Sequence, residues 1–176
     1  MRATGVVRRI DELGRIVIPK EIRKTLRVRD GESLEFFLDK DNIVLKKYSL
    51  MEDLGEFYKK YIDAINTEIN KDIIITDRDK IVAASTNIRK KYINKNISHK
   101  LEEKIKERIP IYKNEMTKMN IINGSEVNIS YSLAPIFVNG DVIGAIMFLS
   151  EKEELDKTDS KMCMVASKFL GKYLEQ

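Results

Sequence analysis

Apolar and polar residues alternate over short runs in the first 50 positions, which indicates short strands interrupted by one helix. Runs rich in β-branched and aromatic residues predict four strands, at 4–10, 15–18, 34–38 and 42–47. Between the second and third of these, Pro19 suits a first helical turn, and Ile22 and Leu26 form an apolar pair four residues apart. The pattern therefore predicts a two-turn helix from Lys20 to Leu26 and a hairpin that turns at 39–42.

These elements are too few to make a comfortable core. Four short strands and one short helix in about 50 residues bury little apolar surface when they fold alone. Residues 1–50 contain no cysteine pair and no metal-ligand cluster that could cross-link them. Oligomerisation is the remaining way to complete a core. We therefore expect an obligate dimer through residues 1–50, with strands exchanged between the two chains.

From Ser49 the spacing of the apolar residues changes to that of a helix. Ser49 and Glu52 have the spacing of a capping box, in which each side chain accepts a hydrogen bond from a free backbone N–H of the other's turn. The apolar positions that follow are Leu50, Leu54, Phe57, Tyr58, Tyr61 and Ile65. The pattern predicts a helix near 50–70 that joins the domain of residues 1–50 to a second domain, residues 51–176.

Strand-like runs and turn residues then alternate as far as residue 150. The runs are 72–76, 80–85, 118–122, 125–138 and 141–150. Asn123-Gly124 and Asn139-Gly140 separate the last three, and Asn-Gly is the strongest short signal for a hairpin. Pro135 cannot donate to a strand ladder, so we expect it at a sheet edge or a bulge.

Helical patterns complete the second domain. They cover 87–94, 98–109 and, at the end of the chain, 157–176. Taken with the strands, they predict an α+β domain: an antiparallel sheet of about five strands, bracketed by the long helices near 50–70 and 157–176. A pocket for a small ligand could lie between the sheet and its helices, but no residue stands out as a ligand contact. A purely structural role in oligomerisation is equally well supported.

Positive charge is concentrated in the first domain. The net charge is +4, and residues 1–50 hold 12 Lys and Arg against 8 Asp and Glu, whereas residues 51–176 hold 20 of each. Seven of the ten arginines lie in residues 1–29, but only two of the 22 lysines do. A guanidinium group binds phosphates and guanine edges with paired hydrogen bonds, which lysine cannot do. The preference for arginine favours an anionic partner, nucleic acid in particular, over a solvated charged face.

Motifs for catalysis or metal binding are missing. His99 is the single histidine and has no neighbouring carboxylate or cysteine, so we expect a surface residue at a helix start. Cys163 is the single cysteine and lies among apolar residues, so we expect it to be buried in a helix. Asp72, Asp77 and Asp79 flank one turn, where local backbone hydrogen bonds are a stronger interpretation than a metal. We expect no enzyme, no metal and no cofactor.

Membrane insertion is also unsupported. The longest uncharged run, residues 127–140, has 14 residues, whereas a bilayer span takes about 20. The N-terminus lacks the apolar core of a signal peptide. We expect a cytoplasmic protein with no membrane contact.

Residues 4–48 resemble the AbrB/SpoVT family of swapped-hairpin transcription regulators. The resemblance lies in "TGVVRRIDELGRIVIPKEIRKTLRV" and "GESLEFFLDKDNIVLKKY", a long and ordered match. It implies that Gly14 is the turn glycine of the family and that Asp11 is the acidic residue that orders the loop. It also implies a set of DNA-contacting cations, which fall on Arg8, Arg15, Arg23 and Lys24. Relatives often have arginine at the last of these positions.

The resemblance extends more weakly to the rest of the chain through its length and order of elements. It implies a GAF-like fold for residues 51–176, double-stranded DNA as the partner, a swapped homodimer through residues 1–50, and a homotetramer through the flanking helices. It further implies control of sporulation genes, as activator and as repressor. The alternative is an antitoxin of a toxin–antitoxin pair, which uses the same N-terminal fold. Antitoxins usually carry a disordered acidic tail, whereas residues 51–176 are neutral and patterned.

Overall fold

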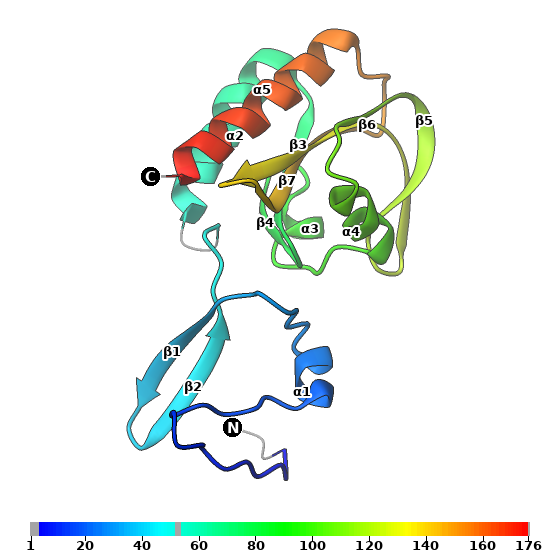
Figure 1. The fold of residues 1–176 in the computed structure, drawn as a ribbon. Coiled ribbons are helices and arrows are strands. Elements are labelled where there is room, and N and C mark those ends of the chain that lie inside the picture. The colour runs from blue at the N-terminus through cyan, green and yellow to red at the C-terminus, as the bar shows by residue number, and fades with distance from the viewer. Residues whose placement is uncertain (1–3, 52–53, 176) are drawn as a thin grey trace. The chain divides into compact units, whose positions relative to one another are not determined.

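The computed structural model describes residues 4–51 and 54–175, and the chain divides into two units between Tyr48 and Ser49 (Figure 1). The first unit contains α1 (Lys20–Thr25), β1 (Leu34–Asp39) and β2 (Asn42–Lys47). The second contains α2 (Gly55–Ile69), β3 (Asp72–Asp77), β4 (Ile81–Ala84), α3 (Arg89–Tyr92), α4 (His99–Lys106), β5 (Ile111–Ile122), β6 (Ser125–Val138), β7 (Asp141–Ser150) and α5 (Lys157–Leu174). The predicted α+β class is confirmed.

The first unit is built on one hairpin and one short helix. β1 and β2 pair antiparallel with Asp39 opposite Asn42, which confirms the predicted hairpin and its turn. α1 covers the predicted helix to within one residue. Pro19 is the N-cap of α1, not its first helical residue, because its ψ of 147° is extended.

The strands predicted at 4–10 and 15–18 are not formed within this chain, so that prediction is wrong for the single subunit. A tight turn joins the two segments: the Gly14 N–H donates to the Asp11 carbonyl at 2.9 Å, and the Asp11 N–H to the Arg15 carbonyl at 3.0 Å. The sheet of this unit contains β1 and β2 alone. A segment forms a strand only when its backbone pairs with a neighbouring strand. The alternation of apolar residues does not show whether such a neighbour exists.

Apolar side chains remain uncovered throughout the first unit. No residue in the range 4–48 is buried. Val7 and Leu38 are 84% and 83% exposed, and Phe36 is 67% exposed. Single exposed apolar residues are ordinary, but a unit without any core is not stable by itself.

The second unit has the predicted antiparallel sheet of five strands, in the order β4-β3-β7-β6-β5. Alternation along each strand sends side chains to two cores: in β3, Ile73 and Ile75 lie in one core and Ile74 in the other. Pro135 pairs with Ala145 of β7, and the β5 ladder begins opposite Leu133. β6 is therefore a local sheet edge at Pro135, as predicted.

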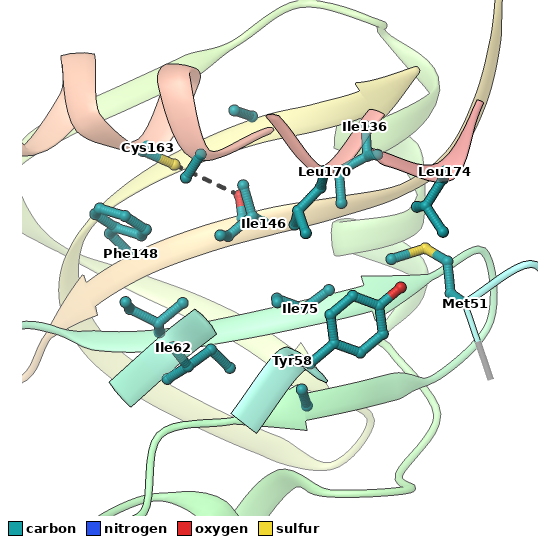
Figure 2. Packing of buried hydrophobic residues seen from close by; sticks show 14 of the residues in the cluster. Met51, Tyr58, Ile62, Ile75, Ile136, Ile146, Phe148, Cys163, Leu170 and Leu174 are labelled. Atoms are coloured by element: carbon teal, nitrogen blue, oxygen red, sulfur yellow. Dashed lines mark hydrogen bonds between the residues drawn. The ribbon is translucent and has the colours of Figure 1, made fainter. Parts of the chain in front are cut away.

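Helices cover both faces of this sheet, with α2 and α5 side by side on one face (Figure 1). The Tyr61 hydroxyl of α2 donates to the Ala166 carbonyl of α5 at 3.0 Å, and the rings of Phe57 and Tyr173 stack at 4.2 Å. Figure 2 shows Cys163 of α5 in the core beneath these helices. Burial raises the pKa of the Cys163 thiol to about 12, so the predicted buried cysteine is confirmed.

The long helix after the first unit begins later than predicted, at Gly55 instead of near Leu50. Met51 is buried in the core, where Gly144 leaves room: a Cβ on Gly144 would lie 2.8 Å from the Met51 sulfur and 2.0 Å from the Thr76 carbonyl oxygen. The predicted capping box involves Glu52, which lies outside the described residues. The helix ends before Asn70, which adopts the left-handed conformation of a C-cap.

Asp77 has a local structural role, whereas one carboxylate oxygen of Asp72 is buried without a hydrogen-bond partner among the described residues. One carboxylate oxygen of Asp77 accepts hydrogen bonds from the backbone N–H groups of Asp79 and Lys80, both at 2.7 Å. His99 begins α4 with its side chain 81% exposed. Among the described helices, none is long and apolar enough to cross a membrane.

Candidate nucleic-acid interface

Arg15 lies at the end of the tight turn of residues 11–15 and is held there by Asp11. One oxygen of Asp11 accepts hydrogen bonds from the backbone N–H groups of Leu13 and Arg15, and the other accepts from Arg15 Nε at 2.7 Å. The Arg15 backbone N–H, followed by its guanidinium, holds the pKa of Asp11 below its usual value. The Arg15 side chain stays 72% exposed, so it is ordered but open to a partner.

Arg23 and Lys24 occupy consecutive positions of α1. Arg23 Nη1 donates to Asp30 at 2.7 Å, while Arg23 Nε is buried and lacks a hydrogen-bond partner within the described structure. Asp30 itself is 94% exposed, so this ion pair exchanges readily with another anion. Lys24 is exposed.

Arg8 lies near the start of α1. It lines an apolar cavity of about 240 Å³ in the first unit, and Ile18, Pro19 and Ile22 line the same cavity. Arg8 Nη1 contacts only the neighbouring Val7 carbonyl, at 3.1 Å. The cavity is otherwise lined mainly by aliphatic side chains of α1, the hairpin and the N-terminal segments.

The four predicted cations lie on three parts of the first unit. Arg8 lines the apolar cavity, Arg15 ends the turn of residues 11–15 and precedes Ile16, which lines the same cavity, and α1 carries Arg23 and Lys24. Whether the four act as one DNA-contacting set remains a prediction.

The end of α1 holds a backbone conformation that glycine usually supplies. Arg27 has a φ of 53°, in the left-handed region that costs a non-glycine residue about 1 kcal/mol or more. Hydrogen bonds from Val28 N–H to the Arg23 carbonyl and from Arg27 N–H to the Lys24 carbonyl complete a Schellman motif. The motif turns the chain back, which places Asp30 within reach of Arg23.

Glu32 fixes the loop that follows this turn. Its side chain is only 7% exposed and accepts hydrogen bonds from the Arg29 backbone N–H and guanidinium, both at 3.0 Å. Lys47 Nζ lies 3.2 Å from the same carboxylate and donates to the Arg27 carbonyl at 2.9 Å. Burial alone would raise the pKa of Glu32, but its bonds to Arg29 and Lys47 outweigh burial and lower the pKa below 4.5. The loop is therefore tied to the base of the hairpin.

Replacement of Glu32 by glutamine is expected to destabilise the first unit by about 2 kcal/mol at pH 7, because Arg29 and Lys47 lose their charged partner in a largely buried place. Since folding lowers the pKa of Glu32, its stabilisation is complete above pH 4.5 and is lost as the pH falls through the folded-state value. The difference between wild type and E32Q should therefore shrink below pH 4.5. Hydrogen exchange of the β1 and β2 amides at several pH values measures it, and a difference independent of pH would contradict the assignment.

Sequence reasoning missed Asp30 and Glu32. Asp30 lies seven positions from its partner Arg23, a spacing that does not suggest an ion pair. Arg29 and Glu32 are three positions apart, a spacing that could have suggested an ion pair. The left-handed Arg27 that creates both contacts has no sequence signal, because glycine is the residue expected there.

The family model described as "Stage V sporulation protein T C-terminal, transcription factor" matches residues 53–175. With the charged hairpin unit that precedes them, these residues make the chain a transcription regulator of two units. Stage V sporulation protein T of Bacillus subtilis (strain 168) is 42% identical over 178 aligned positions, which cover all of both chains. The chain belongs to the stage V sporulation protein T family.

Separate matches support each unit. The transition state regulatory protein AbrB of B. subtilis is 52% identical over 48 residues, which are 27% of this chain and 50% of AbrB. A family model described as "Antidote-toxin recognition MazE, bacterial antitoxin" matches residues 7–53. The cofactor-binding GAF domain of the nutrient sensor CodY from Clostridium difficile aligns with a TM-score of 0.50 at 13% identity, covering 86% of this chain and 92% of that one. This last similarity supports the GAF-like fold alone.

Proposed function

We propose that the protein binds specific sites in double-stranded DNA as a dimer of first units and regulates sporulation genes, activating some and repressing others. The observation that carries this proposal is a unit that exposes its apolar residues and its arginines together. The family relationship of the chain to transcription factors supports DNA binding, and the incomplete core of the first unit supports dimerisation. In this proposal residues 1–50 bind DNA, and residues 51–176 assemble the subunits.

Dimerisation follows from the unpaired segments and the cavity. Residues 4–10 and 15–18 are rich in β-branched side chains and have neither assigned secondary structure nor strand neighbours among the residues described in this unit. Strands from a second chain would pair with them and cover the apolar cavity of about 240 Å³. The exchange of strands also doubles the set of cations and relates the two sets by two-fold symmetry.

Arg8, Arg15, Arg23 and Lys24 are the DNA contacts of this proposal. Arg15 and Arg23 hold their guanidinium groups against the exposed carboxylates of Asp11 and Asp30. A phosphate presents the same paired oxygen acceptors as a carboxylate, so it can replace Asp30 without any change in the arginine. Asp11 also accepts two backbone hydrogen bonds, and it therefore positions Arg15 in the free protein and in the complex.

The second unit contributes assembly to this proposal. α2 and α5 lie side by side, and Val165 and Phe169 of α5 remain 60% and 48% exposed. Association of these helices between two dimers would cover them and form a homotetramer. The proposal also keeps the small-ligand pocket expected between this sheet and its helices, without assigning contact residues.

An antitoxin is the second candidate, and the match of residues 7–53 to the MazE family is the observation that favours it. That match covers only the DNA-binding part. A disordered acidic segment that wraps a toxin is typical of antitoxins, whereas residues 54–175 here form a folded sheet and helices. Copurification of the chain with a small ribonuclease would favour the antitoxin.

The salt dependence of DNA binding tests the leading proposal. Four cations in each of two chains make about eight phosphate contacts, so the slope of the logarithm of the association constant against the logarithm of the salt concentration should be about −7. The probe is a duplex that the protein selects from a random library, and fluorescence anisotropy measures the affinity. A slope close to zero would exclude the proposed function.

A further inference from the structure

Residues 80–101 carry positive charge without any compensating acid. They contain Lys80, Arg89, Lys90, Lys91, Lys95 and Lys100, and no Asp or Glu. The rest of residues 51–176 contains 14 Lys and Arg against 20 Asp and Glu. The neutral total of the second unit therefore conceals one strongly basic segment inside an acidic remainder.

The fold places this segment across one face of the sheet. β4 is an edge strand, and residues 94–97 run along it: the Asn94 N–H donates to the Ile81 carbonyl at 2.9 Å, and the Ile81 N–H to the Lys95 carbonyl at 3.0 Å. An isolated antiparallel bridge joins Lys80 to Asn96. α3 precedes this stretch and packs on β4, and α4 follows it and packs on β5 and β7, so the two short helices lie on the same face of the sheet (Figure 1).

Most of the cations in this segment are open to solvent and unpaired. We name the basic surface by its four exposed members, Arg89, Lys90, Lys95 and Lys100. Within the described part of the chain, none of these four makes an ion pair. The acids near the surface are engaged elsewhere, since Glu151 binds Lys91 at 2.8 Å and Glu103 binds Lys106 at 2.9 Å.

A solvated lysine-rich surface usually mixes both signs of charge, as the rest of α4 does with Lys106 between Glu102 and Glu103. Four like charges between residues 89 and 100, with no acid among those residues, repel one another, and a polyanion relieves that repulsion. Three of the four are lysines, which bind phosphate as point charges and do not distinguish bases. The chemistry fits the backbone of a nucleic acid.

We propose that the basic surface is a second DNA-contacting site, which binds the sugar–phosphate backbone without sequence preference and adds affinity to the specific contacts of the first unit. This inference rests on the proposed function, because it needs DNA that the first unit has already bound. Tethering makes the second contact intramolecular, so weak single interactions add to the total affinity. The basic surface would bind any segment of the duplex within its reach, whatever the base sequence.

The test compares two variants of the full chain that lose equal charge. One is R89Q/K90Q/K95Q/K100Q. The control is K113Q/K157Q/K161Q/K168Q, whose four lysines are also exposed but lie on β5 and α5. The probe is the selected duplex extended by random sequence on both sides, and anisotropy gives the affinity over a range of salt concentrations. Equal thermal melting of the two variants shows that both fold.

The basic-surface variant should bind the extended duplex at least about tenfold more weakly, with a salt slope shallower by about 3 or more, since each lost phosphate contact removes about 0.9. The control variant should keep the wild-type slope. Equal losses in both variants, or no loss in either, would overturn the inference; the latter result would direct the search to an acidic protein partner. R8A/R15A/R23A is measured alongside, because its undiminished binding would speak against the proposed function, whichever result the basic-surface variant gives.

Discussion

Simultaneous replacement of Arg8, Arg15 and Arg23 by alanine should lower the affinity for the selected duplex about 1,000-fold or more. A two-point arginine contact contributes about 1–3 kcal/mol, and the dimer loses six of them. The effect on folding should be small, because Arg15 is 72% exposed and the ion pair of Arg23 involves an exposed aspartate. The salt slope should become shallower, toward the value that the Lys24 contacts alone support.

Three lysines of the same unit provide the matched control. Lys20, Lys40 and Lys46 are exposed, and K20A/K40A/K46A removes the same charge as the arginine variant. General electrostatic attraction is equal in the two variants, so the control should lose less than about tenfold in affinity. If both variants lose affinity equally, net charge accounts for binding and the four assigned contacts are wrong.

The sheet of the second unit could be predicted because its signals are local. Gly124 and Gly140 have φ values of 74° and 84° at the two hairpin turns, and both follow an asparagine in the sequence. Alternation in β3 separates Ile74 from Ile73 and Ile75, as a sheet covered on both faces requires. None of these signals depends on where a distant part of the chain lies.

The elements that could not be predicted depend on distant partners. Residues 4–10 and 15–18 have the composition of strands. Whether they pair depends on a neighbouring strand, which the local pattern does not show. Met51, just before the long helix, is buried beside Gly144, a contact far along the sequence that the local pattern does not show. Tertiary packing outweighs the helical spacing that begins at Leu50.

The candidate site, like the fold, could be predicted only in part from the sequence. The preference for arginine over lysine is visible in composition, and it predicts which region would bind an anion. Asp30 and Glu32 could not be assigned, because their contacts arise from the left-handed turn at Arg27. The basic surface does not show in the charge totals, because acids elsewhere in the second unit cancel its charge.

Replacement of Leu45 by aspartate should abolish the assembly of the first unit. Leu45 lines the apolar cavity and stands opposite Phe36, on the hairpin face that also carries Leu34. A carboxylate there would be buried without a partner when a second chain covers the cavity, at a cost of about 3 kcal/mol or more in each subunit. Native mass spectrometry should find fewer subunits per particle, and DNA affinity should fall at least about 100-fold.

Aspartate at Lys40 is the control for this prediction. Lys40 lies in the turn of the same hairpin with a φ of 52°, a conformation that aspartate tolerates. K40D changes the charge by more than L45D does, yet it should keep the wild-type subunit number because its side chain is exposed. Unaltered assembly and DNA binding in L45D would mean that the first unit completes its core without a second chain. Exchange of strands between subunits would then no longer explain how so small a unit holds its arginines in place.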